Sequence, residues 1–303
     1  MQTILPALYR RVHVAYERQR ITLPDGDFLD LDWLKHDNPA KEVVVLSHGL
    51  EGDSRRPYLA GMARHLHSLG FDILAWHYRS CSGEMNRAAR FYHLAETTDL
   101  AWLVNWLDTQ SPYQSISLVG FSAGGNVTLK YLGEQRARPA KLRRAAAIST
   151  PLDLAGAVTR MERWDSMVYN RRFLKTLTHK AQQKASLNLH PELEAFKKLK
   201  RMHSIREFDD LVTAPLHGFP SAAAYYAHAS TGPYLKGVQI PTLLINAQND
   251  PFLSPRCKST HHFDFGQHVT ALFPPQGGHC GFPGPRLQSA VYWSEQRVGQ
   301  FLV

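Results

Sequence analysis

Cysteine is scarce in this chain of 303 residues, which contains only Cys81, Cys257 and Cys280. Three cysteines do not make the disulfide framework that stabilises many secreted proteins. Their scarcity favours a reducing compartment, so the sequence predicts a cytoplasmic location.

A long apolar run is also missing, because no stretch approaches the roughly 20 residues that a helix needs to cross a bilayer. Arg10 and Arg11 come too early to leave room for the apolar part of a secretory signal peptide. The hydrophobic fraction of 44% is nevertheless ordinary for a globular protein. We therefore expect one large globular domain, or one domain with an insertion, and no membrane span.

Acidic residues are fewer than basic ones, 26 against 35, which gives a net charge of +9. Most of this excess lies between residues 158 and 206, a stretch that contains 12 Lys or Arg but only four Asp or Glu. No nucleic-acid-binding module or set of interleaved aromatic residues accompanies the charge, so no nucleic acid partner is expected. The segment is either a solvated helical face or a surface that attracts an anionic lipid or membrane.

Apolar, β-branched runs alternate with segments of helical periodicity along most of the chain. A hairpin is expected over 20–34, around the turn signal Asp25-Gly26. The further strands are expected over 43–47, 71–76, 115–119, 145–149, 240–246 and 269–273, and the helices over 57–69, 98–108, 125–132 and 287–301. This alternation predicts an α/β fold: a mostly parallel central sheet with helices on both faces.

The alternation stops between residues 151 and 237, where the sequence is basic and helical in pattern. We therefore expect residues 1–150 and 238–303 to form the core, and residues 151–237 to form a helical cap inserted between two strands of its sheet.

The stretch Gly120-Phe121-Ser122-Ala123-Gly124 lies between an expected strand and an expected helix. A serine at such a turn, with glycines two residues to either side, is the nucleophile elbow of α/β-hydrolases. The turn is so sharp that a side chain at either glycine position would clash with a neighbouring element. The sequence thus predicts Ser122 as a nucleophile above the carboxyl edge of the sheet.

A serine nucleophile needs a base that is oriented by an acid, and in α/β-hydrolases the acid precedes the histidine in the chain. Asp250 follows the expected strand 240–246, and His279 lies in a glycine-rich loop after the next strand. Because carboxyl ends of parallel strands share one edge, both side chains should lie near Ser122. Asp153, after the preceding strand, is the rival acid.

Other histidines and a metal site are weaker candidates. His48, His77, His93 and His217 also lie near loops, but none follows the acid in chain order. Cys257, His261 and His262 are spaced like a helical face, yet no carboxylates complete a ligand set, so no metal is expected.

The negative oxygen of a tetrahedral intermediate needs two aimed donors. The backbone N–H of Ala123 is predicted as one, because it lies at the start of a helix directly after the nucleophile. The N–H of Leu50, after the strand that ends at His48-Gly49, is predicted as the second.

Taken together, these motifs resemble those of YheT-like α/β-hydrolases, a group related to animal abhydrolase-domain lipases and yeast medium-chain ester synthases/hydrolases. The resemblance covers nearly the whole chain. It rests on His48-Gly49-Leu50-Glu51-Gly52, Tyr78 to Glu84, Gly120 to Asn126, Glu207-Phe208-Asp209-Asp210 with His217-Gly218-Phe219, Asn249 to Phe252, and Gly277 to Phe282. The resemblance implies a Ser122–Asp250–His279 triad, no cofactor, and carboxylic ester hydrolysis. The family often has leucine at the position of Ala123, which predicts a slightly roomier pocket here.

The function expected from these residues is a serine esterase that acts on small-molecule esters with short- to medium-chain acyl groups. An acyltransferase would use the same triad with an alcohol in place of water. A catalytically silent binding protein of the same fold is a third alternative, which a complete triad in the right order disfavours.

Overall fold

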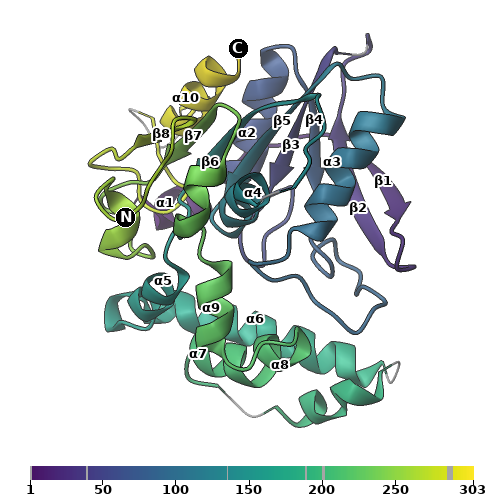
Figure 1. Cartoon of the computed structure of the whole chain (residues 1–303), viewed down its shortest axis with the longest axis vertical. Helices are drawn as coiled ribbons and strands as arrows, with labels where there is room; N and C mark the ends of the chain where they lie inside the picture. Colours follow the sequence, from purple (N-terminus) through teal and green to yellow (C-terminus); the bar gives the residue numbers. More distant parts are fainter. Residues whose placement is uncertain (1, 39, 135, 188–189, 200–201, 285–288) are drawn as a thin grey trace.

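The computed structural model of the chain describes all residues except 1, 39, 135, 188–189, 200–201 and 285–288 (Figure 1). The strands of the described residues form one sheet in the order β1-β2-β4-β3-β5-β6-β7-β8. They are β1 (Glu17–Thr22), β2 (Phe28–Leu34), β3 (Glu42–Ser47), β4 (Asp72–Trp76), β5 (Ser115–Phe121), β6 (Leu142–Ile148), β7 (Thr242–Ile245) and β8 (Val269–Leu272). The pairs β1–β2 and β2–β4 are antiparallel, and the other pairs are parallel. The predicted α/β fold with a mostly parallel sheet is confirmed.

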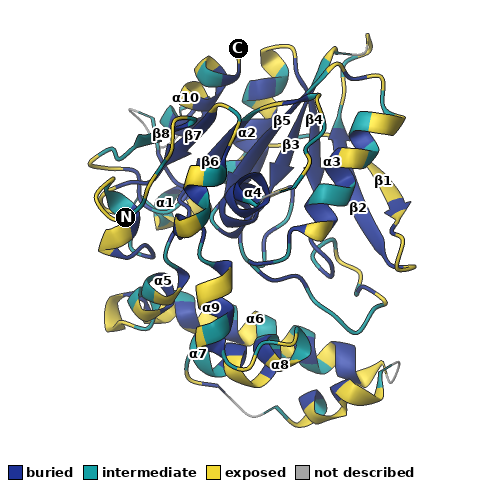
Figure 2. Ribbon diagram, viewed as in Figure 1, coloured by how far each residue is buried: buried dark blue, intermediate teal, exposed yellow. Residues whose placement is uncertain are grey.

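Helices cover both faces of the sheet (Figure 1). Helices α2 (Pro57–Ser68) and α10 (Trp293–Leu302) pack on one face, and α3 (Thr98–Gln110) and α4 (Ala123–Gly133) pack on the other. Successive residues of β3 contribute alternately to the two apolar clusters, as the two-residue repeat of a strand requires. The central strands and α4 are buried along their length (Figure 2).

The hairpin and the further strands predicted from the sequence are present, with ends that differ by up to three residues. The helix predicted over 287–301 is wrong over residues 289–292, which are not helical: α10 begins at Trp293, and Leu287 lies outside the described residues. The Glu295 carboxylate accepts the N–H of Tyr292 at 2.8 Å and so caps the first turn there. A short helix, α1 (Ile4–Tyr9), was not predicted.

Between β6 and β7 the described residues form helices and connecting turns but no strand (Figure 1). The α-helices are α5 (Leu154–Met161), α6 (Met167–Ser186), α7 (Ile205–Phe208), α8 (Ala214–Leu216) and α9 (Ala222–Ala229). Shorter 3₁₀ turns lie at Trp164–Ser166, Pro191–Lys198 and Gly232–Gly237, and a π-helix spans Asp209–Thr213. We call residues 151–237 the helical segment. It has an apolar cluster of its own, which the side chain of Ala95 from the core also joins.

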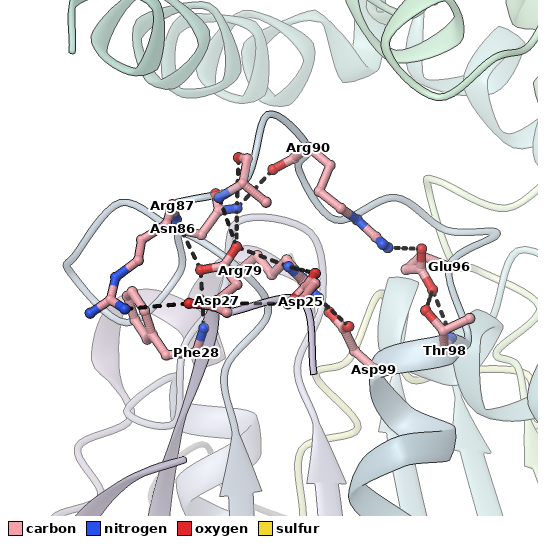
Figure 3. A network of polar contacts seen from close by, with 12 residues as sticks. Asp25, Asp27, Phe28, Arg79, Asn86, Arg87, Arg90, Glu96, Thr98 and Asp99 are labelled. Carbon is pink, nitrogen blue, oxygen red and sulfur yellow. Dashed lines mark hydrogen bonds and ion pairs between the residues drawn. The ribbon is translucent and has the colours of Figure 1, made fainter. Parts of the chain in front are cut away.

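A buried ionic network fixes the loops that face the helical segment (Figure 3). The Arg79 guanidinium, which follows β4, donates to Asp25 at 2.7 Å, to Asp27 at 2.9 Å and to both carboxylate oxygens of Asp99. Asn86 donates to Asp27 at 2.8 Å and joins the next loop to the same cluster. Arg79 thereby holds together three elements: the β1–β2 hairpin, the loop after β4 and helix α3.

Candidate active site

Ser122 lies at the turn between β5 and α4, with a backbone φ of 54° and ψ of −115°. A Cβ on Gly120 would overlap the carbonyl of Gly124, and one on Gly124 would overlap the carbonyl of Ser47. Both positions therefore require glycine for the reason that the sequence predicts. The turn presents the Ser122 side chain beyond the carboxyl end of β5.

Ser122, His279 and Asp250 form a hydrogen-bonded chain at this edge of the sheet. The Ser122 Oγ lies 2.9 Å from Nε2 of His279, and Nδ1 of the same ring lies 2.8 Å from Oδ2 of Asp250. The second oxygen of Asp250 accepts the N–H of Phe252 at 2.8 Å, which fixes the carboxylate. The structure thus brings together the three side chains that the sequence analysis assigned to a triad.

The rival acid, Asp153, has a different set of partners. Its carboxylate accepts the N–H of Gly156 at 3.1 Å and caps helix α5. Its other oxygen accepts the Ser254 hydroxyl at 3.2 Å. These bonds hold Asp153 as a structural group at the start of the helical segment, and His279 pairs with Asp250.

The Asp250 carboxylate also sets the charge state of the histidine. Burial alone disfavours the imidazolium, but the adjacent carboxylate outweighs burial and raises the pKa of His279 above its usual value. The ring is therefore held as a stronger base than a free histidine. Its Nδ1 hydrogen points to Asp250, which leaves Nε2 as the atom that can take a proton from Ser122.

The backbone donors predicted for the oxyanion lie beside Ser122. Leu50 and Ala123 line the same cavity as the serine. In the turn after β3, Gly49 N–H donates to the Tyr58 hydroxyl at 3.0 Å and Glu51 N–H donates to the Tyr92 hydroxyl at 2.8 Å. Neither Leu50 N–H nor Ala123 N–H donates to any acceptor among the described residues. Two donors next to the nucleophile are thus left available to a ligand.

The cavity above Ser122 has a volume of about 120 Å³ and lies between the core and the helical segment. Apolar side chains from the helical segment, including Leu154, Val158, Phe173 and Leu177, form one wall. His93 and His217, whose rings lie 4.2 Å apart, line another part. The arrangement can hold an apolar chain with its carbonyl group near Ser122.

The other histidines named in the sequence analysis lie outside the hydrogen-bonded chain of Ser122, His279 and Asp250. The ring of His48 is buried between Gly49 O and Tyr78 N–H, and His77 is bonded to Asp32. His261 and His262 are exposed. No group of three His, Cys, Asp or Glu in the described part of the chain could hold a metal ion.

Two positioning residues near the N-terminus were missed by the sequence analysis. The Thr3 hydroxyl accepts the N–H of His279 at 2.9 Å, and the Gln2 side chain accepts the N–H of Gly277 at 2.9 Å. Gln2 also accepts from the side chain of Asn249, next to Asp250, at 2.8 Å. No local pattern marks these residues, because their partners lie at the other end of the chain.

Comparison with known proteins agrees with this arrangement. A family model described as alpha/beta hydrolase fold matches residues 42–283. The Escherichia coli (strain K12) protein YheT is 36% identical over all of this chain and 89% of its own length. The Mus musculus protein named phospholipase ABHD3 is 28% identical over 93% of this chain and 70% of its own length.

A solved structure of the Pyrococcus furiosus esterase Pf2001 has a TM-score of 0.61 and 19% identity, over 95% of this chain and 90% of that one. At that identity, the likeness bears on the fold alone. No helix in the described residues is both long and apolar enough to span a membrane. From the family model and the full-length match, the chain belongs to the α/β-hydrolase fold family, as a YheT-like member.

Proposed function

We propose that this protein is a serine esterase that hydrolyses carboxylic esters with short- to medium-chain acyl groups. The observation that carries the proposal is the hydrogen-bonded chain from Ser122 through His279 to Asp250, with bonds of 2.9 and 2.8 Å. The names of the family relatives, which include a phospholipase, support ester chemistry.

The proposed reaction has two halves. His279 Nε2 takes the proton of Ser122 while the serine oxygen attacks the acyl carbon, and the negative charge on the former carbonyl oxygen is met by the N–H groups of Leu50 and Ala123. The intermediate collapses, the alcohol leaves with the proton from His279, and the acyl group stays on Ser122. A water molecule then repeats the same proton movements and releases the carboxylic acid. Asp250 keeps the imidazole in the required tautomer throughout.

The shape and lining of the cavity support the proposed substrate class. Its apolar wall suits an acyl chain, because burying each methylene group contributes about 0.8 kcal/mol. We further propose that the helical segment acts as a cap, since its side chains supply this wall.

The test of the proposed function is Ser122→Ala, measured with a series of p-nitrophenyl esters of graded acyl length. We expect turnover to fall by about 10³-fold or more, because triad residues act as a unit. Labelling by a fluorophosphonate should disappear, and the thermal unfolding temperature should stay near that of the wild type. Ser115→Ala, at the far end of β5, is the control and should keep both activity and label. Near-normal turnover by pure Ser122→Ala protein would overturn the assignment.

We also propose that the helical segment contacts anionic lipid surfaces. Near the start of α6 the side chains of Trp164 and Val168 are 81% and 78% exposed, beside exposed Arg163, Arg171 and Arg172. Large apolar side chains with arginines around them are typical of surfaces that bind the interface of a membrane. Met161 and Phe173, on either side of this stretch in sequence, line the cavity. A surface bound there would therefore present esters close to the site.

A further inference from the structure

Lys180, on helix α6, reaches from the helical segment to the turn that carries Leu50. Its Nζ lies 2.9 Å from Oε1 of Glu51, and the two side chains are only 15% and 6% exposed. The hydroxyl of Tyr92 donates to the same carboxylate oxygen at 2.9 Å and accepts the backbone N–H of Glu51 at 2.8 Å. One carboxylate thus joins a helix of the segment, the turn after β3 and the loop before α3.

This cluster holds the residue that directly follows the proposed oxyanion donor. Glu51 has a backbone φ of 53°, a conformation that residues other than glycine rarely adopt without support. Its carbonyl accepts the Arg56 guanidinium at 2.9 Å, and Gly52 N–H donates to Gly49 O at 3.0 Å. Leu50 is therefore flanked by anchored residues, and the direction of its N–H depends on their positions.

We propose that Lys180 is a positioning residue that aligns the Leu50 N–H with the oxyanion, acting through Glu51 and Tyr92. The inference rests on the proposed esterase function and adds to it a contribution of the helical segment to the chemical step. A donor that is aligned with the developing oxyanion stabilises the transition state more than the bound ester. Loss of the Lys180 contact should therefore lower kcat and leave KM nearly unchanged.

Lys184, on the same helix, offers a matched control. It is also buried and also reaches the core, but its Nζ donates to the carbonyl oxygens of Asn86 at 3.0 Å and Arg90 at 3.3 Å. It makes no contact with the turn that holds Leu50 among the described residues. Removing its charge therefore removes a contact between the segment and the core without touching Glu51 directly.

The experiment compares Lys180→Met, Lys180→Arg and Lys184→Met on p-nitrophenyl butyrate. We expect Lys180→Met to lower kcat by about 30- to 100-fold, with KM within about threefold of the wild type, since loss of one oxyanion donor costs about 10²- to 10³-fold. Lys180→Arg should recover most of kcat, and Lys184→Met should change it by less than about threefold. Equal losses in both methionine variants, or a change confined to KM, would overturn the proposal.

A second readout separates alignment from general loosening. Binding of a trifluoromethyl ketone, which forms the tetrahedral adduct on the serine, should weaken in Lys180→Met by the same factor as kcat/KM. Glu51→Gln, which keeps the shape of the side chain, covers the case in which Lys180→Met fails to fold, and should show the same parallel loss. Ketone affinity that is unchanged in a folded variant contradicts the proposal.

If Ser122→Ala stays fully active, the esterase assignment has failed. If Ser122→Ala is inactive and Lys180→Met has normal kcat, only this inference has failed.

Discussion

At the scale of single residues, most residues with a strained backbone conformation lie at the edge of the sheet that carries the proposed active site. The described residues other than glycine with positive φ are Glu51, Ser80, Ser122, Ser149, Cys280 and Phe282. Ser122 follows β5, and Glu51, Ser80 and Ser149 lie in the turns after β3, β4 and β6; Cys280 follows His279. Each such residue costs about 1–3 kcal/mol and persists only where its surroundings hold it. Their position along one edge agrees with a site whose groups are fixed before substrate binds.

The pH dependence of the reaction is predicted from His279. Only the neutral ring can take the Ser122 proton, and the Asp250 carboxylate raises the pKa of His279 above its usual value of about 6.5 despite burial. Activity should therefore increase with pH through an apparent pKa above 6.5. Asp250→Asn should lower kcat by orders of magnitude and move this limb to lower pH, as measured by kcat/KM between pH 5 and 10.

Asp153→Asn is the control for this profile, because Asp153 caps α5 and has no contact with His279 among the described residues. It should leave the position of the limb unchanged. A mild Asp250→Asn variant beside a severely impaired Asp153→Asn variant would identify Asp153 as the acid instead.

At the scale of elements, the loop between β4 and α3 packs its His93 ring against the helical segment. The rings of His217, Phe219 and Tyr225 surround it, and His93 Nδ1 accepts the N–H of Ala95. Burial lowers the pKa of His93 far below its usual value, with further contributions from the charges of His217, Arg90, His228 and Lys130. This contact between the core and the segment therefore requires a neutral imidazole.

Acid should weaken this contact. Below about pH 6.5 the unfolded chain binds a proton at His93 that the folded protein does not bind, so the free energy of unfolding falls as pH falls. The loss is about 1.4 kcal/mol for each pH unit. In His93→Asn, which keeps an acceptor for Ala95, this contribution should be absent, as measured by urea unfolding at pH 7.5, 5.5 and 4.5. His261→Gln, at an exposed site, should follow the wild type. Parallel pH profiles for wild type and His93→Asn would contradict the prediction.

The elements of the core could be predicted because their patterns are local. An apolar run with a helix after it marks most of the parallel strands. The carboxyl ends of parallel strands must meet at one edge, so Ser122, Asp250 and His279 could be grouped from chain order. The direction of Lys180 and Lys184 could not be predicted. Both belong to a run of basic residues that was interpreted as one charged surface, yet both side chains point to the core. Their partners, Glu51 and Asn86, lie about a hundred residues or more away in the sequence.

At the scale of the whole molecule, the basic residues of the helical segment do not all face solvent. Some bind the core, and others pair with acids of the segment. Of the twelve basic residues from 158 to 206, Lys180 and Lys184 bind the core, and Arg160, Lys197 and Arg206 pair with acids of the segment itself. Lys200 and Arg201 lie outside the described residues. The charge available to a partner is therefore smaller than the sequence predicts, and part of it lies beside the exposed Trp164.

The proposed contact with anionic lipid should be sensitive to salt. Attraction between exposed charges and a surface weakens as ionic strength rises, whereas a neutral soluble ester experiences no such attraction. Activity on an ester dispersed in vesicles of phosphatidylglycerol should fall between 20 and 300 mM salt, while activity on a soluble ester should barely change. Replacing Arg171 and Arg172 by Glu should produce the same selective loss, and Trp164→Ala should reduce sedimentation with the vesicles. Equal salt responses for the two substrates would leave the segment as an ordinary solvated surface.

The contact between Thr3 and His279 has a consequence for the order of events during translation. The two residues are separated by 276 positions, and Arg10 likewise pairs with Glu295 across 285 positions. Chains emerge from the ribosome N-terminus first. Thr3 and Arg10 are therefore synthesised long before their partners, His279 and Glu295. A nascent chain that stalls before His279 can contain the finished nucleophile elbow and still lack its base. In such a fragment Ser122 has no base to take its proton, so the proposed esterase activity requires translation through His279.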